Sequence, residues 1–119
     1  MRNYKELTVW QRSMEMISSA YAITNSLPNT EKFGIISQLN RAAVSVACNI
    51  AEGSSRTSQK DFKRFLEISL GSAYECETLI LASIKVGLVA ESDVSQIQSQ
   101  LTEIQKMLYS LINKLNTNS

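Results

Sequence analysis

Residues 94–115 read VSQIQSQLTEIQKMLYSLINKL, and this stretch decides the fold class. Its large apolar side chains recur every three or four residues, at Val94, Ile97, Leu101, Ile104, Leu108, Leu111 and Leu115. This spacing places them along one side of an α-helix, in the narrow apolar seam that the helices of a left-handed bundle share. The stretch therefore predicts a long amphipathic helix that packs against other helices.

The same spacing recurs in three earlier segments. The first carries Leu7, Trp10, Met14, Ile17, Tyr21 and Thr24. The second carries Ile36, Leu39, Ala43, Val46 and Ile50, and the third carries Phe62, Leu66, Ser69, Ala73, Cys76, Ile80 and Ile84. We expect Pro28 to end the first helix, and Gly53 and Gly87 to end the next two in left-handed geometry. Ser58 is expected to cap the third helix by accepting a hydrogen bond from the Asp61 amide.

The number and spacing of these segments predict how the chain folds. At 119 residues the chain has the size of one domain. Consecutive helices joined by short connections pack antiparallel, with their apolar stripes in a common core. We therefore predict an all-α fold, an antiparallel up-and-down four-helix bundle that spans residues 1–119 as a single domain.

The third predicted helix carries more apolar surface than one seam uses. Its additional apolar residues are Phe65, Ile68, Leu70, Tyr74, Leu79, Leu81 and Val86. A helix that is apolar nearly all round is buried on several sides, and no helix is central in a bundle of this size. We therefore predict that the chain assembles with copies of itself into a homo-oligomer.

The composition argues against most kinds of catalysis and metal binding. The chain has no histidine, and its two cysteines, Cys48 and Cys76, are too few to hold zinc. No glycine-rich phosphate loop is present in the sequence. The remaining alternative is a carboxylate cluster that holds a hard cation, drawn from Glu52, Glu67, Glu75 and Glu77. We predict no enzyme activity, no cofactor, no metal and no small-molecule substrate.

The apolar residues are scattered along the chain and form no membrane-spanning run. No stretch approaches the roughly 18–20 continuous apolar residues that such a helix needs. The first residues also lack the pattern of a signal peptide. We expect a cytoplasmic protein with two free thiols and no membrane association.

A basic cluster lies at the start of the third predicted helix, although the net charge of the chain is only +1. Its members are Arg56, Lys60, Lys63 and Arg64. Cations at a helix N-terminus oppose the helix dipole, so their position indicates an anionic partner. Hydroxyl groups available for phosphate contacts adjoin the cluster at Ser54, Ser55, Thr57 and Ser58. The alternative is that the cations pair with acidic residues of a neighbouring subunit.

A polar stripe follows the second predicted helix. It consists of Gln38, Arg41, Ser45, Asn49 and Glu52. One interpretation is a solvated face on which Arg41 bonds a nearby glutamate. The other is that Asn49 and Glu52 are partly buried and bond the loop that follows, which would fix how the third helix departs.

Several segments resemble one known family. They are residues 7–11 (LTVWQ), 38–46 (QLNRAAVSV), 49–53 (NIAEG), 62–66 (FKRFL), and 71–72 (GS) with 75–78 (ECET). In this order and spacing they resemble the four-helix-bundle proteins encoded in intervening sequences of bacterial 23S ribosomal RNA genes, which are sometimes labelled ribosomal proteins. The NIAEG stretch before a loop rich in serine and arginine is the most specific part.

This resemblance implies an up-and-down four-helix bundle that assembles into a ring-shaped homo-oligomer, typically a pentamer. The family is related in fold to the accessory protein of diversity-generating retroelements, which resembles a basic ring that engages RNA, so the resemblance favours RNA as a partner. The chain departs from the family at Asn40, where a second arginine beside Arg41 is common. This departure implies weaker nucleic-acid binding than in a typical member.

The sequence leaves two functional hypotheses. The first is a non-catalytic, oligomeric adaptor that binds structured RNA or another nucleic acid through the basic cluster, with Arg41 near it. We expect such a ring to repeat its phosphate contacts and to recognise shape and backbone rather than stack on bases. The second is a protein–protein scaffold with no affinity for nucleic acid, which would hold a partner on the spare apolar surface of the third helix.

Overall fold

All four predicted helices are present in the computed structural model, which describes residues 2–117. α1 spans Thr8–Asn25, α2 spans Ser37–Ser54, α3 spans Gln59–Lys85 and α4 spans Ser95–Thr117. Single turns of 3-10 helix lie at Tyr4–Glu6, Asn29–Glu31 and Glu91–Val94, and a π-helical turn at Lys32–Ile36 leads into α2. The described residues form no strand, so the predicted all-α class is confirmed.

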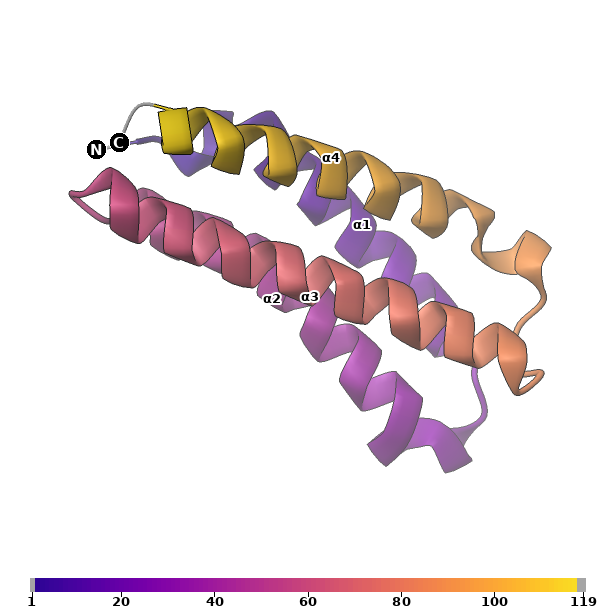
Figure 1. Cartoon of the computed structure of the whole chain (residues 1–119). Coiled ribbons are helices and arrows are strands. Elements are labelled where there is room, and N and C mark those ends of the chain that lie inside the picture. The colour runs from indigo at the N-terminus through magenta and orange to yellow at the C-terminus, as the bar shows by residue number, and fades with distance from the viewer. Residues whose placement is uncertain (1, 118–119) are drawn as a thin grey trace.

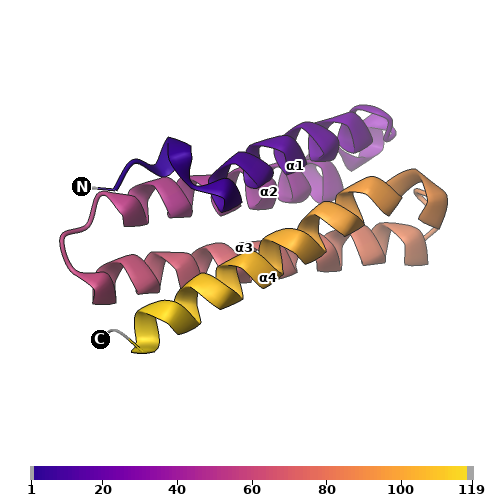
Figure 2. The same cartoon turned by 90° about the horizontal axis from the view of Figure 1, so that it is seen from above.

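The helices run up and down the long axis of the molecule, whose extents are 45 × 21 × 19 Å (Figure 1). Hydrogen bonds fasten α2 to α3: the hydroxyl of Ser69 donates to the carbonyl of Val46 at 2.7 Å, and the hydroxyls of Ser45 and Ser72 lie 2.9 Å apart. In Figure 2 the N-terminal arm, the last turn of α4 and the α2–α3 loop lie at one end of the bundle. The α1–α2 and α3–α4 connections lie at the other end.

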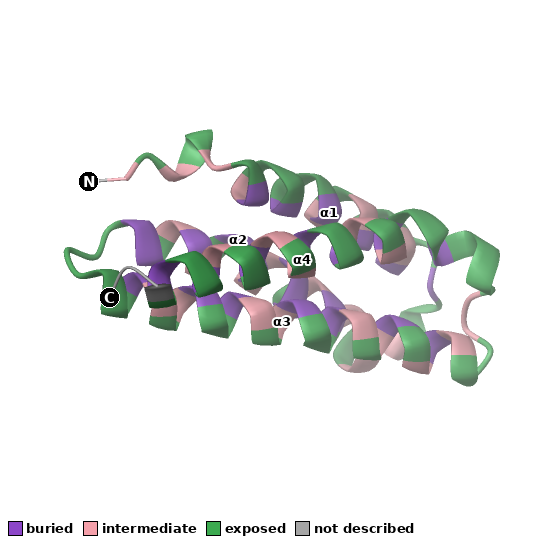
Figure 3. Ribbon diagram, turned by 45° about the horizontal axis from the view of Figure 1, so that its top comes forward, coloured by how far each residue is buried: buried purple, intermediate pink, exposed green. Residues whose placement is uncertain are grey.

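The core is built from the inward face of each helix, as the burial pattern in Figure 3 shows. α4 and the 3-10 turn before it contribute Val94, Ile97, Leu101, Ile104, Leu108, Ile112 and Leu115, each no more than 7% exposed. The predicted stripe of α4 is therefore confirmed except at Leu111, which is half-buried beside Ile112. The stripes of α2 and α3 are confirmed except at their ends, where Ile36 and Ile84 are half-buried.

The predicted stripe of the first helix is only partly right, because the buried row is rotated by about a quarter turn. Of the predicted residues, Thr24 is buried, and Leu7, Trp10 and Ile17 are half-buried against the core. α1 buries Val9, Ser13, Met16, Ala20 and Thr24. Met14 and Tyr21, which were predicted to face the core, are 45% and 42% exposed. Both stripes have the three-and-four spacing, and the prediction followed the larger side chains. The structure instead places Ser13 and Ala20 inward beside the larger Met16, because close packing of the helices leaves less room at those positions.

Gly53 does not end α2 in left-handed geometry, contrary to the prediction. The helix continues through it to Ser54, and Gly87 is the glycine with a positive φ, 81°, in residues 2–117. A Cβ atom at Gly53 would lie 2.7 Å from the Cβ of Phe65 and 3.1 Å from the Cδ1 of Phe62. The missing side chain therefore allows α2 and α3 to approach each other closely beside their connecting loop.

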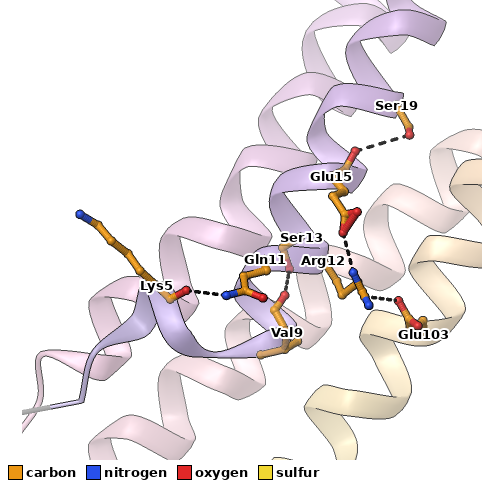
Figure 4. A network of polar contacts seen from close by, with 8 residues as sticks. All are labelled: Lys5, Val9, Gln11, Arg12, Ser13, Glu15, Ser19 and Glu103. Atoms are coloured by element: carbon orange, nitrogen blue, oxygen red, sulfur yellow. Dashed lines mark hydrogen bonds and ion pairs between the residues drawn. The ribbon is translucent and has the colours of Figure 1, made fainter.

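Arg12 links the first helix to the last. Its Nη1 lies 2.9 Å from the Oε1 of Glu15, and its Nε lies 3.2 Å from the Oε1 of Glu103 (Figure 4). The hydrogen bond to Glu15, and then the charges of both carboxylates, raise the pKa of Arg12. All three side chains are about half exposed, so the interaction orients α1 on α4 more than it stabilises the fold.

Candidate nucleic-acid interface

The loop between α2 and α3 is short, and a side chain caps the helix that follows it. The amides of Ser55 and Arg56 each donate at 3.1 Å to carbonyls of the last turn of α2. Ser58 has extended backbone geometry, and its hydroxyl accepts a hydrogen bond from the Asp61 amide at 3.1 Å. The predicted N-cap is therefore confirmed. This cap sets the direction of α3 and with it the direction of the cations on its first turns.

Four of the five predicted cations lie together at this end of the bundle. Arg56 is in the loop, and Lys60, Lys63 and Arg64 are on the first two turns of α3. Lys63 is half-buried, and its Nζ donates to the Oδ1 of Asn116 on α4 at 2.8 Å. The other three side chains are exposed. None of the four forms an ion pair with a carboxylate in the part of the chain that the structure describes.

Arg41 lies apart from these four residues, so the expectation that it lies near them is wrong. It is on the second turn of α2, 15 residues before Arg56, which corresponds to about 20 Å along a helix. Its exposed side chain lines a shallow hollow with Gln38, Ser45 and Glu75. The sequence suggests that Arg41 lies near the cluster, because both adjoin the polar stripe on α2. That stripe runs the whole length of the helix, so its two ends are far apart.

The middle of the polar stripe on α2 fastens that helix to α3. Asn49 is half-buried, and its Nδ2 donates to the carbonyl of Ser45 at 2.8 Å and to its hydroxyl at 3.0 Å. The Ser45 hydroxyl also contacts Ser72 of α3. Asn49 thus bonds one turn back along its own helix and not the following loop, and Glu52 is exposed. Arg41 forms no ion pair within residues 2–117, so each interpretation of the stripe is only partly right.

Arg2 joins the cluster, although no pattern in the sequence indicated it. Its Nη1 donates to the carbonyl of Arg56 at 3.1 Å, and its guanidinium carbon lies 4.1 Å from the centre of the Phe62 ring. The two arginines are 54 residues apart, so no local pattern connects them. They meet because the N-terminal arm crosses the α2–α3 loop. We call Arg2, Arg56, Lys60, Lys63 and Arg64 together the basic end.

Two phenylalanines support the arginines of the basic end. Phe62 is buried beneath Arg2, and Phe65 is half-buried beneath Arg56, whose guanidinium carbon lies 4.7 Å from the ring centre. Such contacts contribute about 0.5–1 kcal/mol at exposed sites and hold the guanidinium plane in place. One face of each ring is therefore covered by arginine and is not open to a base. The arrangement presents fixed charges, which suits phosphate recognition.

The hydroxyl groups predicted to contact phosphate differ in their availability. Ser54 is 1% exposed and donates to a carbonyl one turn back at 2.9 Å, so it is not available. The hydroxyl of Ser55 donates to a carbonyl at 2.7 Å, and that of Ser58 is used in the helix cap. Thr57 is exposed in the loop. Of the four, Thr57 is the best placed to donate to a ligand.

The other titratable groups do not form a second site. No three carboxylate or cysteine side chains in residues 2–117 lie close enough to hold a metal ion, so Glu52, Glu67, Glu75 and Glu77 are not brought together. Both cysteines are free thiols: Cys48 is exposed and Cys76 is buried. Burial, with a smaller contribution from the Glu75 charge, raises the pKa of Cys76 to about 12. No helix among the described residues is long and apolar enough to cross a membrane.

Comparison with known proteins places the chain in a family. A family model described as the 23S rRNA-intervening sequence protein matches residues 5–110. The chain belongs to this family. The match covers α1 to α3 and most of α4, and it includes the basic end except for Arg2, which lies before it. The resemblance inferred from the sequence segments is therefore confirmed.

A solved structure supports the same assignment. It is the crystal structure of a protein of unknown function from the S23 ribosomal protein family of Bacteroides thetaiotaomicron. That protein is 29% identical to this chain, with a TM-score of 0.82 over 88% of this chain and 98% of its own. No curated protein matches the chain. The comparisons thus give the family and the fold, and neither name states an activity.

Proposed function

We propose that this chain is a non-catalytic, oligomeric adaptor that binds structured RNA through its basic end. The observation that carries the proposal is the gathering of five cations at one end of the bundle, none of them in an ion pair with a described carboxylate. Phosphate contacts supply most of the affinity in nucleic-acid binding. A phosphate that approaches these side chains displaces no carboxylate. The family name refers to 23S ribosomal RNA, which makes RNA the first ligand to test.

The distribution of charge along the molecule supports end-on binding. The end opposite the basic end carries exposed carboxylates at Glu91 and Asp93, at the start of the 3-10 turn that leads into α4. The exposed lysines Lys32 and Lys85 at that end offset these carboxylates, so the excess of positive charge lies at the basic end. A polyanion therefore attracts the basic end first. The near-zero net charge of the chain is therefore compatible with local attraction to RNA.

Exposed apolar residues support self-assembly. Tyr74 and Leu81 on α3 are 50% and 51% exposed, and seven residues separate them, so they share one side of the helix. Neighbouring copies of the chain would cover this surface and bring several basic ends together. Weak phosphate contacts repeated in one assembly act through avidity. The resemblance to the ribosomal intervening-sequence proteins implies a pentamer, and we propose that state for this chain.

The alternative is a protein–protein scaffold with no affinity for nucleic acid. The same exposed side chains of α3, Tyr74 and Leu81, favour it, because a partner helix would bury them as well as a second copy would. The two functions differ in what happens to RNA. A scaffold would form a stable complex with a protein and leave labelled RNA free at low salt.

The proposed function is tested by reversing charge at one end of the molecule and then at the other. Lys60→Glu with Arg64→Glu changes the basic end, and Lys32→Glu with Lys85→Glu changes the net charge equally at exposed positions of the opposite end. Fluorescence anisotropy with a labelled, structured ribosomal RNA fragment measures the affinity of each. We expect the first variant to lose at least tenfold in affinity and the second to stay close to wild type. Equal losses in both variants, or wild-type affinity in the first, would exclude the basic end as the binding site.

A further inference from the structure

The two arginines of the basic end that lie outside α3 are held in fixed positions. Arg2 is fixed at two points, by its hydrogen bond to the carbonyl of Arg56 and by its contact with the Phe62 ring. Arg56 is fixed by its contact with the Phe65 ring. Phe62 and Phe65 are three residues apart on α3, so their rings are neighbours on that helix. The two arginines are thus held next to each other, with Arg2 bonded to the backbone of Arg56, before any ligand binds.

A hollow of about 620 Å³ opens next to these guanidinium groups. Four residues line it: Arg2, Ser55, Arg56 and Thr57. Two are permanently cationic and two carry hydroxyl groups, and no carboxylate lines the hollow within residues 2–117. A guanidinium group has five N–H donors, of which Arg2 uses one on the Arg56 carbonyl. The lining is therefore rich in unused donors and poor in acceptors, which is the composition of an anion site.

We propose that this hollow binds a single phosphate group of the RNA, with Arg2 and Arg56 donating to its oxygens and Thr57 donating from the loop. The inference rests on the proposed function and adds to it a specific pocket and a new residue, Arg2. Guanidinium planes match the geometry of phosphate oxygens in paired hydrogen bonds. The hollow is larger than one phosphate group, so it leaves room for the attached nucleoside. Both a backbone phosphodiester and a terminal phosphate monoester have the required chemistry.

Contacts that hold the arginine side chains in place before binding increase the affinity of the hollow for phosphate. A side chain that is already ordered loses less conformational entropy when a ligand arrives. Arg2 contributes only if the N-terminal arm stays across the loop, and its hydrogen bond to Arg56 keeps it there. Arg2→Gln removes the charge, most of the donors and the contact with the Phe62 ring. It leaves α1 to α4 unchanged, because Arg2 precedes them and is not part of the core.

Titration with inorganic phosphate tests the hollow without RNA. We expect the backbone amide signals of Ser55 and Thr57 in two-dimensional NMR spectra to shift and saturate as phosphate is added at constant ionic strength. Arg2→Gln should weaken this binding about tenfold, and Thr57→Val should weaken it about threefold without disturbing the arm. Lys32→Gln, at the other end of the bundle, should have no effect. Shifts that occur elsewhere, or that persist unchanged in Arg2→Gln, would overturn the inference.

A second arm of the experiment identifies the phosphate source and separates this inference from the proposed function. One RNA is compared with and without a 5′-phosphate. Tighter, Arg2-dependent binding of the phosphorylated RNA assigns a terminal monoester, and equal but Arg2-dependent binding assigns a backbone diester. RNA binding that needs Lys60 and Arg64 but is indifferent to Arg2 would reject the hollow and keep the RNA-binding function. If the wild-type protein binds inorganic phosphate in the hollow but does not bind RNA, the proposed RNA ligand is rejected and the phosphate site is kept.

Discussion

Gly53 and Gly71 both lie inside long helices, but only Gly53 touches another helix. A Cβ at Gly53 would come within 2.7 Å of Phe65, whereas one at Gly71 meets nothing within 4 Å. We expect Gly53→Ala to lower the free energy of unfolding by about 1–3 kcal/mol, since the helices must separate. Gly71→Ala should raise it by about 0.5–1 kcal/mol through higher helix propensity. Urea unfolding of both variants measures the difference, and a stabilised Gly53→Ala would show that α2 and α3 are not so close.

The two cysteines differ in burial and therefore in reactivity. In the native protein we expect iodoacetamide to modify the exposed Cys48 and to spare Cys76, which is buried and whose pKa of about 12 keeps it protonated. Mass spectrometry before and after denaturation counts the modified thiols. Rapid modification of Cys76 in native buffer would contradict its place in the core.

The raised pKa of Cys76 also has a consequence for stability. Above the ordinary thiol pKa of about 8.5 the unfolded chain releases a proton that the folded chain retains up to a pH of about 12. The free energy of unfolding should therefore be unaffected by this group below that window and fall as the pH rises through it. Urea unfolding as a function of pH measures this slope. In Cys76→Ala the slope should be smaller, and an equal slope in that variant would assign the effect to other groups.

At the residue scale, the sequence identified side chains whose role is set by near neighbours and missed those set by distant ones. Ser58 was predicted correctly as a cap because its partner, Asp61, is three residues away. Arg2 was missed because its contact with Arg56 spans 54 residues. Gly53 was recognised as special for the wrong reason, since the close approach of Phe65 is a property of the packed helices.

At the element scale, the start of α3 combines a stabilising cap with destabilising charges. We expect Ser58→Ala to lower the free energy of unfolding by about 1 kcal/mol, because the Asp61 amide loses its acceptor. Lys60→Glu with Arg64→Glu should raise it by at most about a few tenths of a kcal/mol, because Lys60 lies in the first turn, where acids are favoured, and Arg64 lies in the second turn. Thermal unfolding by circular dichroism compares the variants. The same double variant should lose RNA binding and stay folded. If it also unfolds, the loss of binding cannot be assigned to the charges alone.

The apolar stripes of whole helices were predictable where one stripe dominates. α4 carries a single row of large apolar residues, and the row faces the core almost as predicted. α1 carries two adjacent rows with helical spacing, and hydrophobicity alone favoured the row that includes Met14 and Tyr21. The true row contains Ser13 and Ala20, whose small size matters only once a neighbouring helix is in place. Packing, which depends on all four helices, decides between such rows.

At the scale of the whole molecule, the exposed side of α3 predicts the state of assembly. We expect the protein to elute as a homo-oligomer at micromolar concentration, with its mass measured by light scattering. Tyr74→Lys with Leu81→Lys should shift it toward the monomer, because burying two unpaired lysines in an interface is costly. Ser99→Lys with Ser110→Lys changes exposed positions of α4 by the same charge and should leave the mass unchanged. A monomeric wild-type protein would remove the basis for avidity.

The salt dependence of RNA binding by the wild-type protein tests whether the basic end binds RNA through phosphate contacts. Fluorescence anisotropy with a structured ribosomal RNA fragment is measured over a series of salt concentrations, with a matched DNA duplex in parallel. Binding through the basic end releases counterions, so we predict that log K falls linearly with log salt concentration, with a slope steeper than about −2. We also predict that the RNA binds more tightly than the duplex DNA. No binding at low salt, or binding whose strength does not change with salt, would contradict an RNA adaptor that works through Arg2, Arg56, Lys60, Lys63 and Arg64.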